Sequence, residues 1–163
     1  MTTYSPFVSA DLRKQIQATL NPLNLWNEDV EELLLATCAQ ESLFGTYRTQ
    51  GNGGPARGVF QMEGEDHDDI WKNYLAYHPG LAAQIKALAN GNPVADEMIN
   101  NDAYAIAMAR VHYLRKPGNL PSCLDLQAIW QYYKKWYNTP QGAATQLQFV
   151  IHYQKYVTDG KAT

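Results

Sequence analysis

The residues best suited to chemistry lie between Leu33 and Gln61. An apolar run ends in Glu41-Ser42, and a glycine-rich loop follows before Gln61. A carboxyl near the C-terminal end of a helix feels the negative end of the helix dipole, and apolar neighbours keep water away from it. Both effects raise the pKa of a carboxyl, so that it can hold a proton near neutral pH and donate it to a leaving oxygen. The pattern predicts a general acid at the wall of a cleft, and the alternative is an ordinary solvated glutamate at a helix end.

The helix that must carry Glu41 is predicted to begin after Asn27. Asn27 is a good N-cap, and two acids follow it where the helix dipole favours negative charge. Apolar residues then recur at helical spacing and place Glu41 on the same stripe as Leu34 and Cys38. Gly45 is the expected end of this helix. Residues 46–57 are rich in glycine and are predicted to form a loop that holds no helix.

The rest of the chain predicts further helices separated by proline and glycine. Ser9 is the expected cap of the first helix, Asn101 or Asp102 caps a later one, and Asp125 starts another. The other helices are expected to start near Glu65, at Pro79, in a short piece at Pro93 and near Ala144. No repeat or linker interrupts the pattern. Residues 1–163 are therefore predicted to form a single all-α domain of roughly seven or eight irregularly packed helices.

Composition argues against several classes of partner. The net charge is −3, the isoelectric point is about 5.7 and no basic patch stands out, which argues against nucleic acid. No run approaches the roughly 18 apolar residues of a membrane span, and no signal peptide is expected at the N-terminus. Cys38 and Cys123 are too few for a disulfide framework, and Cys38 is expected to be a buried thiol. The eleven tyrosines and four tryptophans suit a carbohydrate-binding groove, or else the core of a helical domain.

A second carboxylate would be needed for hydrolysis of a glycoside. The candidates follow Gln61 closely: Glu63, Glu65, Asp66, Asp68 and Asp69. The three aspartates also suit the N-terminus of a helix, so Glu63 is the best candidate for the cleft wall. The run Asp66-His67-Asp68-Asp69 has no second ligand motif elsewhere in the chain, so no metal site and no cofactor are predicted.

The motifs around Glu41 resemble those of the lysozyme superfamily, most closely the soluble lytic transglycosylases and goose-type lysozymes. The matching residues are Glu41, Ser42, Gly58, Val59, Phe60 and Gln61. A third family motif, a helix ending in Tyr-Asn, is matched by Trp136-Tyr137-Asn138 without the usual preceding alanines. Gly64 stands where the family often has proline. The spacing of Gln40-Glu41-Ser42 from Gly45, and of Gly58 from Gln61-Met62-Glu63, is also similar to that of small transglycosylase-like proteins of bacteriophages.

The resemblance implies a lysozyme-like fold in which the glycine-rich loop covers an active-site cleft. It also implies cleavage of the β-1,4 bond between N-acetylmuramic acid and N-acetylglucosamine, with Glu41 as general acid and then as base. Ser42 and Gln61 would position the sugar or the carboxyl, and Gly58 would let the backbone approach the glycan. Glu63, Tyr137 and Asn138 are the other expected substrate contacts. Phe60 is expected either under the site or in the core.

Two alternatives stay open beside the lytic transglycosylase. One is a muramidase that uses a second carboxylate, and the other is a non-catalytic virion or glycan-binding protein on the same fold. The expected partners are peptidoglycan glycan strands and, for a phage protein, other virion proteins. The expected place of action is the bacterial periplasm or cell wall, reached with a virion or after the membrane has been permeabilised.

Overall fold

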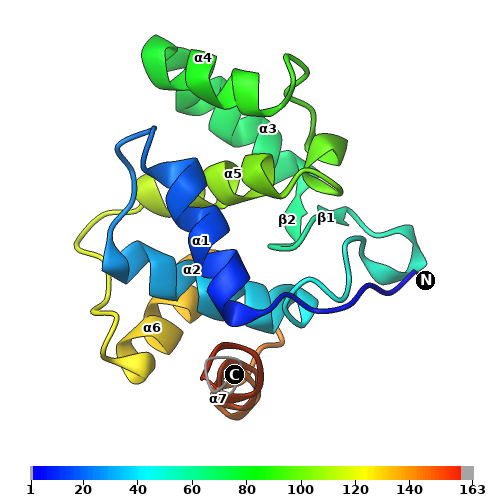
Figure 1. Cartoon of the computed structure of the whole chain (residues 1–163), viewed down its shortest axis with the longest axis vertical. Helices are drawn as coiled ribbons and strands as arrows, with labels where there is room; N and C mark the ends of the chain where they lie inside the picture. Colours follow the sequence, from blue (N-terminus) through cyan, green and yellow to red (C-terminus); the bar gives the residue numbers. More distant parts are fainter. Residues whose placement is uncertain (1, 159–163) are drawn as a thin grey trace.

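The computed structural model describes residues 2–158, and Figure 1 shows their arrangement. Met1 and residues 159–163, which belong to the predicted single domain, lie outside the described residues. Within the described range the chain forms seven α-helices and one two-stranded sheet, which confirms the predicted all-α class. The elements are α1 (Ser9–Leu20), α2 (Glu28–Ser42), β1 (Ala56–Arg57), β2 (Met62–Glu63), α3 (Gly64–Asn73), α4 (Pro79–Leu88), α5 (Asp102–Leu114), α6 (Leu126–Tyr133) and α7 (Gln146–Tyr153).

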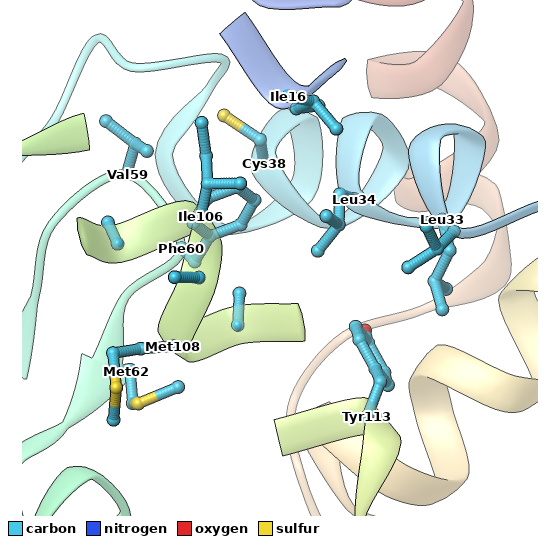
Figure 2. Packing of buried hydrophobic residues seen from close by; sticks show 14 of the residues in the cluster. Ile16, Leu33, Leu34, Cys38, Val59, Phe60, Met62, Ile106, Met108 and Tyr113 are labelled. Carbon is cyan, nitrogen blue, oxygen red and sulfur yellow. The ribbon is translucent and has the colours of Figure 1, made fainter. Parts of the chain in front are cut away.

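Helix α2 lies at the centre of the fold. Every residue from Val30 to Ala39 is buried, so the helix is enclosed on all sides rather than on one face. Figure 2 shows side chains of α2 between Ile16 of α1 and Tyr113 of α5. A helix packed all round is held firmly in place, and the side chains at its end therefore have fixed positions.

Buried acids on α2 are paired with a cation near its N-terminal end. Arg13 of α1 forms ion pairs with Glu31 at 2.9 Å and with Glu32 at 2.8 Å. Trp26 Nε1 and Gln17 Nε2 donate to Glu31, and the Tyr153 hydroxyl donates to Glu32. These contacts join α1, α2 and α7 through charges that would be costly to bury alone.

The helix starts that depend on a local cap are mostly confirmed. Asn27 accepts a hydrogen bond from Val30 N, Asn101 from Tyr104 N and Asp125 from Ala128 N. The cap predicted at Ser9 is wrong, because α1 already begins at Ser9 and Val8 occupies the N-cap position. Ser9 is fully buried, and packing rather than capping decides where this helix starts.

The end of α2 differs from the prediction. The helix ends at Ser42, and the chain turns through three residues with positive φ: Leu43 at 48°, Phe44 at 60° and Gly45 at 89°. The loop predicted over residues 46–57 holds a single 3₁₀ turn, Gly51–Gly53, and the short strand β1. The predicted loop is therefore more ordered than its glycine content indicates.

A tight turn at Gly58 joins β1 to the segment that carries Gln61. In the sheet Ala56 pairs with Glu63 and Arg57 with Met62, antiparallel. Gly58 has φ of 75°, a left-handed conformation that glycine adopts without steric cost. A Cβ on Gly58 would lie 2.4 Å from the backbone oxygen of Met98, so this position needs glycine for space as well as for conformation.

Other short turns complete the chain. Leu75–Tyr77 and Ala95–Met98 form 3₁₀ helices, and α6 and α7 continue as π-helical turns over Lys134–Asn138 and Gln154–Thr158. In the part of the chain that the structure describes, no helix combines the length and apolar character that crossing a membrane requires.

Substituting two glycines of similar φ should separate conformation from space. Gly53 has φ of 68°, and a Cβ added there would meet nothing within 4 Å, so Gly53→Ala should lower the free energy of unfolding by about 1 kcal/mol. Gly58→Ala adds a backbone clash with Met98, and we expect it to cost about 1–3 kcal/mol more. Urea denaturation followed by circular dichroism measures both. Equal losses in the two variants would contradict the close packing of Gly58 on Met98.

Candidate active site

Glu41 lies in the last turn of α2, beside the C-terminal half of the chain. Its Oε1 accepts a hydrogen bond of 2.5 Å from the Tyr133 hydroxyl at the end of α6. Within residues 2–158, Oε2 has no hydrogen-bond partner and Glu41 forms no ion pair. One carboxyl oxygen is thus fixed by the protein, and the other is available to a ligand.

The environment of Glu41 favours its protonated form. Burial raises the pKa of Glu41 from the ordinary 4.5 to about 7, and the hydrogen bond from Tyr133 opposes part of this rise. The buried glutamates of the same helix, Glu31 and Glu32, have Arg13 beside them, whereas Glu41 has only a neutral hydroxyl. A carboxyl whose pKa lies near neutral pH can both give and take a proton.

Glu41 lines two hollows of the surface. The larger has a volume of about 400 Å³ and the smaller about 210 Å³, and Glu41 and Gln61 line both. The larger is also lined by Met62, Glu63, Asp66, His112, Tyr137, Asn138 and Thr139. The smaller is also lined by Tyr47, Thr49, Gln50 and Gly51. We call the larger one the Glu41 pocket.

A third hollow continues from the smaller one along the glycine-rich segment. It has a volume of about 400 Å³ and shares Thr49, Gln50 and Gly51 with its neighbour. Residues 51–54 and Arg57 line it, and the Arg57 Nε donates to Asp96 at 2.8 Å across it. The three hollows together give Glu41 a position partway along an extended depression, of which the Glu41 pocket is the polar part.

A π-helical turn brings aromatic side chains to the wall of the Glu41 pocket. Tyr137 lies in this turn, and its hydroxyl donates to the backbone oxygen of Phe60 at 2.6 Å. The rings of Tyr133 and Tyr137 are stacked with centroids 6.1 Å apart. The Tyr137 contact ties the turn to the Gly58–Gln61 segment and so fixes the two walls of the pocket relative to each other.

His112 of α5 completes this wall as a neutral side chain. Its Nε2 lies 2.9 Å from the backbone oxygen of Trp136, and its ring is 4.8 Å from that of Tyr137. Burial lowers the pKa of His112, so its ring is uncharged at neutral pH and donates its Nε2 proton to that carbonyl. The histidine therefore adds no cation that would lower the pKa of Glu41.

Five of the predicted site residues lie together. Glu41, Gln61, Glu63, Tyr137 and Asn138 all line the Glu41 pocket. The backbone of Gln61 has φ of 48°, and its side-chain nitrogen donates to the Gly58 oxygen at 2.9 Å. This local bond holds the side chain at the mouth between the two hollows that Glu41 lines.

The other three predicted site residues, Ser42, Gly58 and Phe60, are buried. The Ser42 side chain is fully enclosed, accepts a hydrogen bond from Gly45 N and donates to the Cys38 oxygen. Phe60 is 1% exposed and packs in the core (Figure 2), and Gly58 lies under Met98. Ser42 and Gly58 hold the helix end and the turn in place, and Phe60 lies in the core, which is one of the two positions expected for it.

Some residues that line the Glu41 pocket or contact Glu41 were not singled out from the sequence. Tyr133 stands four residues before Tyr137, and this helical spacing could have placed both rings on one face. Asp66 was one of the candidate second carboxylates but was ranked below Glu63 because it also suits the start of a helix; it lies at that helix start and lines the Glu41 pocket as well. His112 and Thr139 carry no local signal, because only the packing of α5 against the π-helical turn brings them here.

Comparison with known proteins adds no relative. No protein-family model matches the chain, and no match was found among curated proteins or among solved structures. The chemistry therefore follows from the pocket itself. It holds a carboxyl able to carry a proton at neutral pH, amide and hydroxyl groups that can bind a polyhydroxy ligand, and two further carboxylates, Glu63 and Asp66.

Removing the Tyr133 hydroxyl should raise the pKa of Glu41 further. The hydroxyl stabilises the charged carboxylate, so Tyr133→Phe should shift the pKa upward from about 7 by about one unit. The pKa is measured by ¹³C NMR of the glutamate side-chain carboxyls. Tyr132→Phe is the matched control, because Tyr132 packs on Tyr113 and donates nothing to Glu41. A Glu41 pKa in the Tyr133→Phe variant that is equal to or below the wild-type value would show that the Tyr133 hydroxyl does not stabilise the carboxylate.

Proposed function

We propose that this protein is a peptidoglycan lytic transglycosylase that cleaves the β-1,4 bond between N-acetylmuramic acid and N-acetylglucosamine. The observation that supports it most is the Glu41 carboxyl, whose pKa is raised to about 7 and whose Oε2 has no partner among residues 2–158. The proposal includes a lysozyme-like arrangement in which the glycine-rich segment 51–54 borders the depression that binds the glycan. The proposed substrate is part of the bacterial cell wall, which the protein would reach as part of a phage virion or after the membrane has been permeabilised.

In this proposal Glu41 transfers one proton in each direction. The protonated carboxyl gives its proton to the glycosidic oxygen, and the bond from that oxygen to C1 of the muramyl residue breaks. The carboxylate, now stabilised by the Tyr133 hydroxyl, takes the proton of the muramyl 6-hydroxyl. The 6-oxygen attacks C1 and closes a 1,6-anhydro ring. Because the nucleophile belongs to the substrate, its high effective concentration replaces a second protein nucleophile.

Two acidic side chains keep hydrolysis as a second candidate. Glu63 and Asp66 line the Glu41 pocket, and both are exposed at its rim. A carboxylate across the pocket from the acid could activate a water, and this geometry would make the protein a muramidase. The polar lining of the Glu41 pocket suits transglycosylation as well as hydrolysis, and neither reaction requires a cofactor.

Replacing Glu41 should remove activity without unfolding the protein. Glu41→Gln keeps the size of the side chain but cannot donate an acidic proton, so we expect clearing of peptidoglycan in a zymogram to fall about 10²–10⁴-fold. Glu28→Gln is the matched control, because Glu28 is an exposed acid in the first turn of the same helix. Equal clearing by wild type and Glu41→Gln would exclude Glu41 from the reaction. No clearing by the wild type would favour a non-catalytic glycan-binding or virion role.

Product analysis should separate the two reactions. A transglycosylase releases muropeptides with 1,6-anhydro ends, whereas a muramidase releases reducing ends with one more water. We expect mass spectrometry to show anhydro products from the wild type, and the same products from Glu63→Gln and Asp66→Asn. Reducing-end products that disappear in either variant would instead identify that carboxylate as the base of a hydrolase.

A further inference from the structure

Another pocket lies on the π-helical turn, beside the Glu41 pocket. It has a volume of about 470 Å³, within the range of roughly 300–1,000 Å³ that is typical of small-ligand sites. Its lining residues are Pro117, Gly118, Asn119, Pro121, Ala128, Gln131, Tyr132, Lys135 and Trp136. The two pockets have no lining residue in common. They are adjacent on the π-helical turn, because Trp136 lines this pocket and the next residue, Tyr137, lines the Glu41 pocket. We call this other pocket the Trp136 pocket.

Positive charge gathers at the Trp136 pocket although the whole chain is acidic. Lys135 Nζ lies 4.7 Å from the centre of the Trp136 indole, and Lys116 Nζ lies 5.7 Å from it. Neither lysine forms an ion pair with any residue between 2 and 158, and the lining of the pocket includes no acid. Lys135 lines the pocket and is not neutralised there by an ion pair. Lys116 lies beside the same indole, outside the lining, and its charge also acts on Asp69, whose pKa it helps to lower.

This combination suits a small anion with an apolar body. The ammonium groups can pair with carboxylates, the indole and the Tyr132 ring can pack on aliphatic groups, and the amides of Asn119 and Gln131 can bind peptide groups. A neutral sugar would leave both ammonium groups unused. A long polyanion would be repelled by the rest of a protein whose net charge is −3.

We propose that the Trp136 pocket binds the carboxylates of a short acidic peptide, of the kind that the muramyl residues of peptidoglycan carry. The inference rests on the proposed function, because that function places a muramyl residue in the neighbouring Glu41 pocket. The two pockets are joined rigidly, since His112 of the Glu41 pocket donates to the backbone oxygen of Trp136. One substrate could then have its sugar chain in the first pocket and its peptide in the second.

The experiment measures peptide binding in a protein that cannot cleave. The Glu41→Gln variant, labelled with ¹⁵N, is titrated with the free tripeptide L-Ala-γ-D-Glu-meso-diaminopimelate and followed by NMR. We expect shifts of the Trp136 indole N–H and of the Lys135 amide. The double substitution Lys116→Ala/Lys135→Ala should weaken binding about three- to tenfold, because each exposed ion pair contributes little. The same peptide with its carboxylates amidated should bind correspondingly less.

Matched controls decide whether the charge acts locally. The control variant Lys72→Ala/Lys155→Ala removes the same charge from two exposed positions elsewhere on the surface. Lys155 Nζ also lies beside an aromatic ring, 5.1 Å from the centre of Tyr156. This variant should leave the affinity for the peptide unchanged. Equal binding of the amidated peptide, equal loss in the control variant, or shifts confined to other surfaces would overturn the proposal. The same shifts with a peptide-free chitin tetrasaccharide would identify a sugar site instead. Peptide binding by a wild type that clears no peptidoglycan would remove the proposed cleavage and keep the pocket.

Discussion

The burial of a carboxyl that has no cation beside it is the constraint on which the site depends. Helix α2 is enclosed from Val30 to Ala39, and its buried acids Glu31 and Glu32 are paired with Arg13 and with neutral donors. At its C-terminal end the chain offers Glu41 a neutral hydroxyl from Tyr133 instead. Burial favours the protonated form, the hydroxyl favours the charged form, and the balance brings the pKa to about 7. A cation beside Glu41 would lower its pKa and keep it ionised, and an anion would raise its pKa and keep it protonated. Either would prevent the carboxyl from both giving and taking a proton.

The walls around this carboxyl are held by backbone contacts rather than by side chains alone. Gly58 packs against Met98 with a positive φ, and the turn that follows presents Gln61 at the mouth of the pocket. The Tyr137 hydroxyl bonds the Phe60 oxygen and so joins this turn to the end of α6. Sites that are built on such fixed elements keep their geometry when a ligand binds. The same π-helical turn faces the Trp136 pocket, so the two pockets cannot shift independently.

Local signals let the sequence predict much of the fold. The caps at Asn27, Asn101 and Asp125 act within a few residues and were predictable, whereas Ser9 was mistaken for a cap because its burial depends on distant packing. In the site, Glu41 and Gln61 were predictable from their motifs. The burial of Ser42 and Phe60, and the arrival of His112, depend on how α2 and α5 pack on the remaining chain, and no short pattern encodes that packing. The hydrogen bond from Tyr133 also spans 92 residues of sequence.

The most direct test of the central claim is the pH dependence of stability in wild type and Glu41→Gln. A raised native pKa means that the native protein holds a proton that the unfolded chain has lost, so wild-type stability should fall as the pH rises from about 4.5 to about 7. Glutamine does not titrate, so the difference in unfolding free energy, variant minus wild type, should increase across this window by about 3 kcal/mol and level off above it. Urea titrations at closely spaced pH values give this difference. A difference that stays constant from pH 4 to pH 8 would show that Glu41 titrates normally, and it would contradict the account.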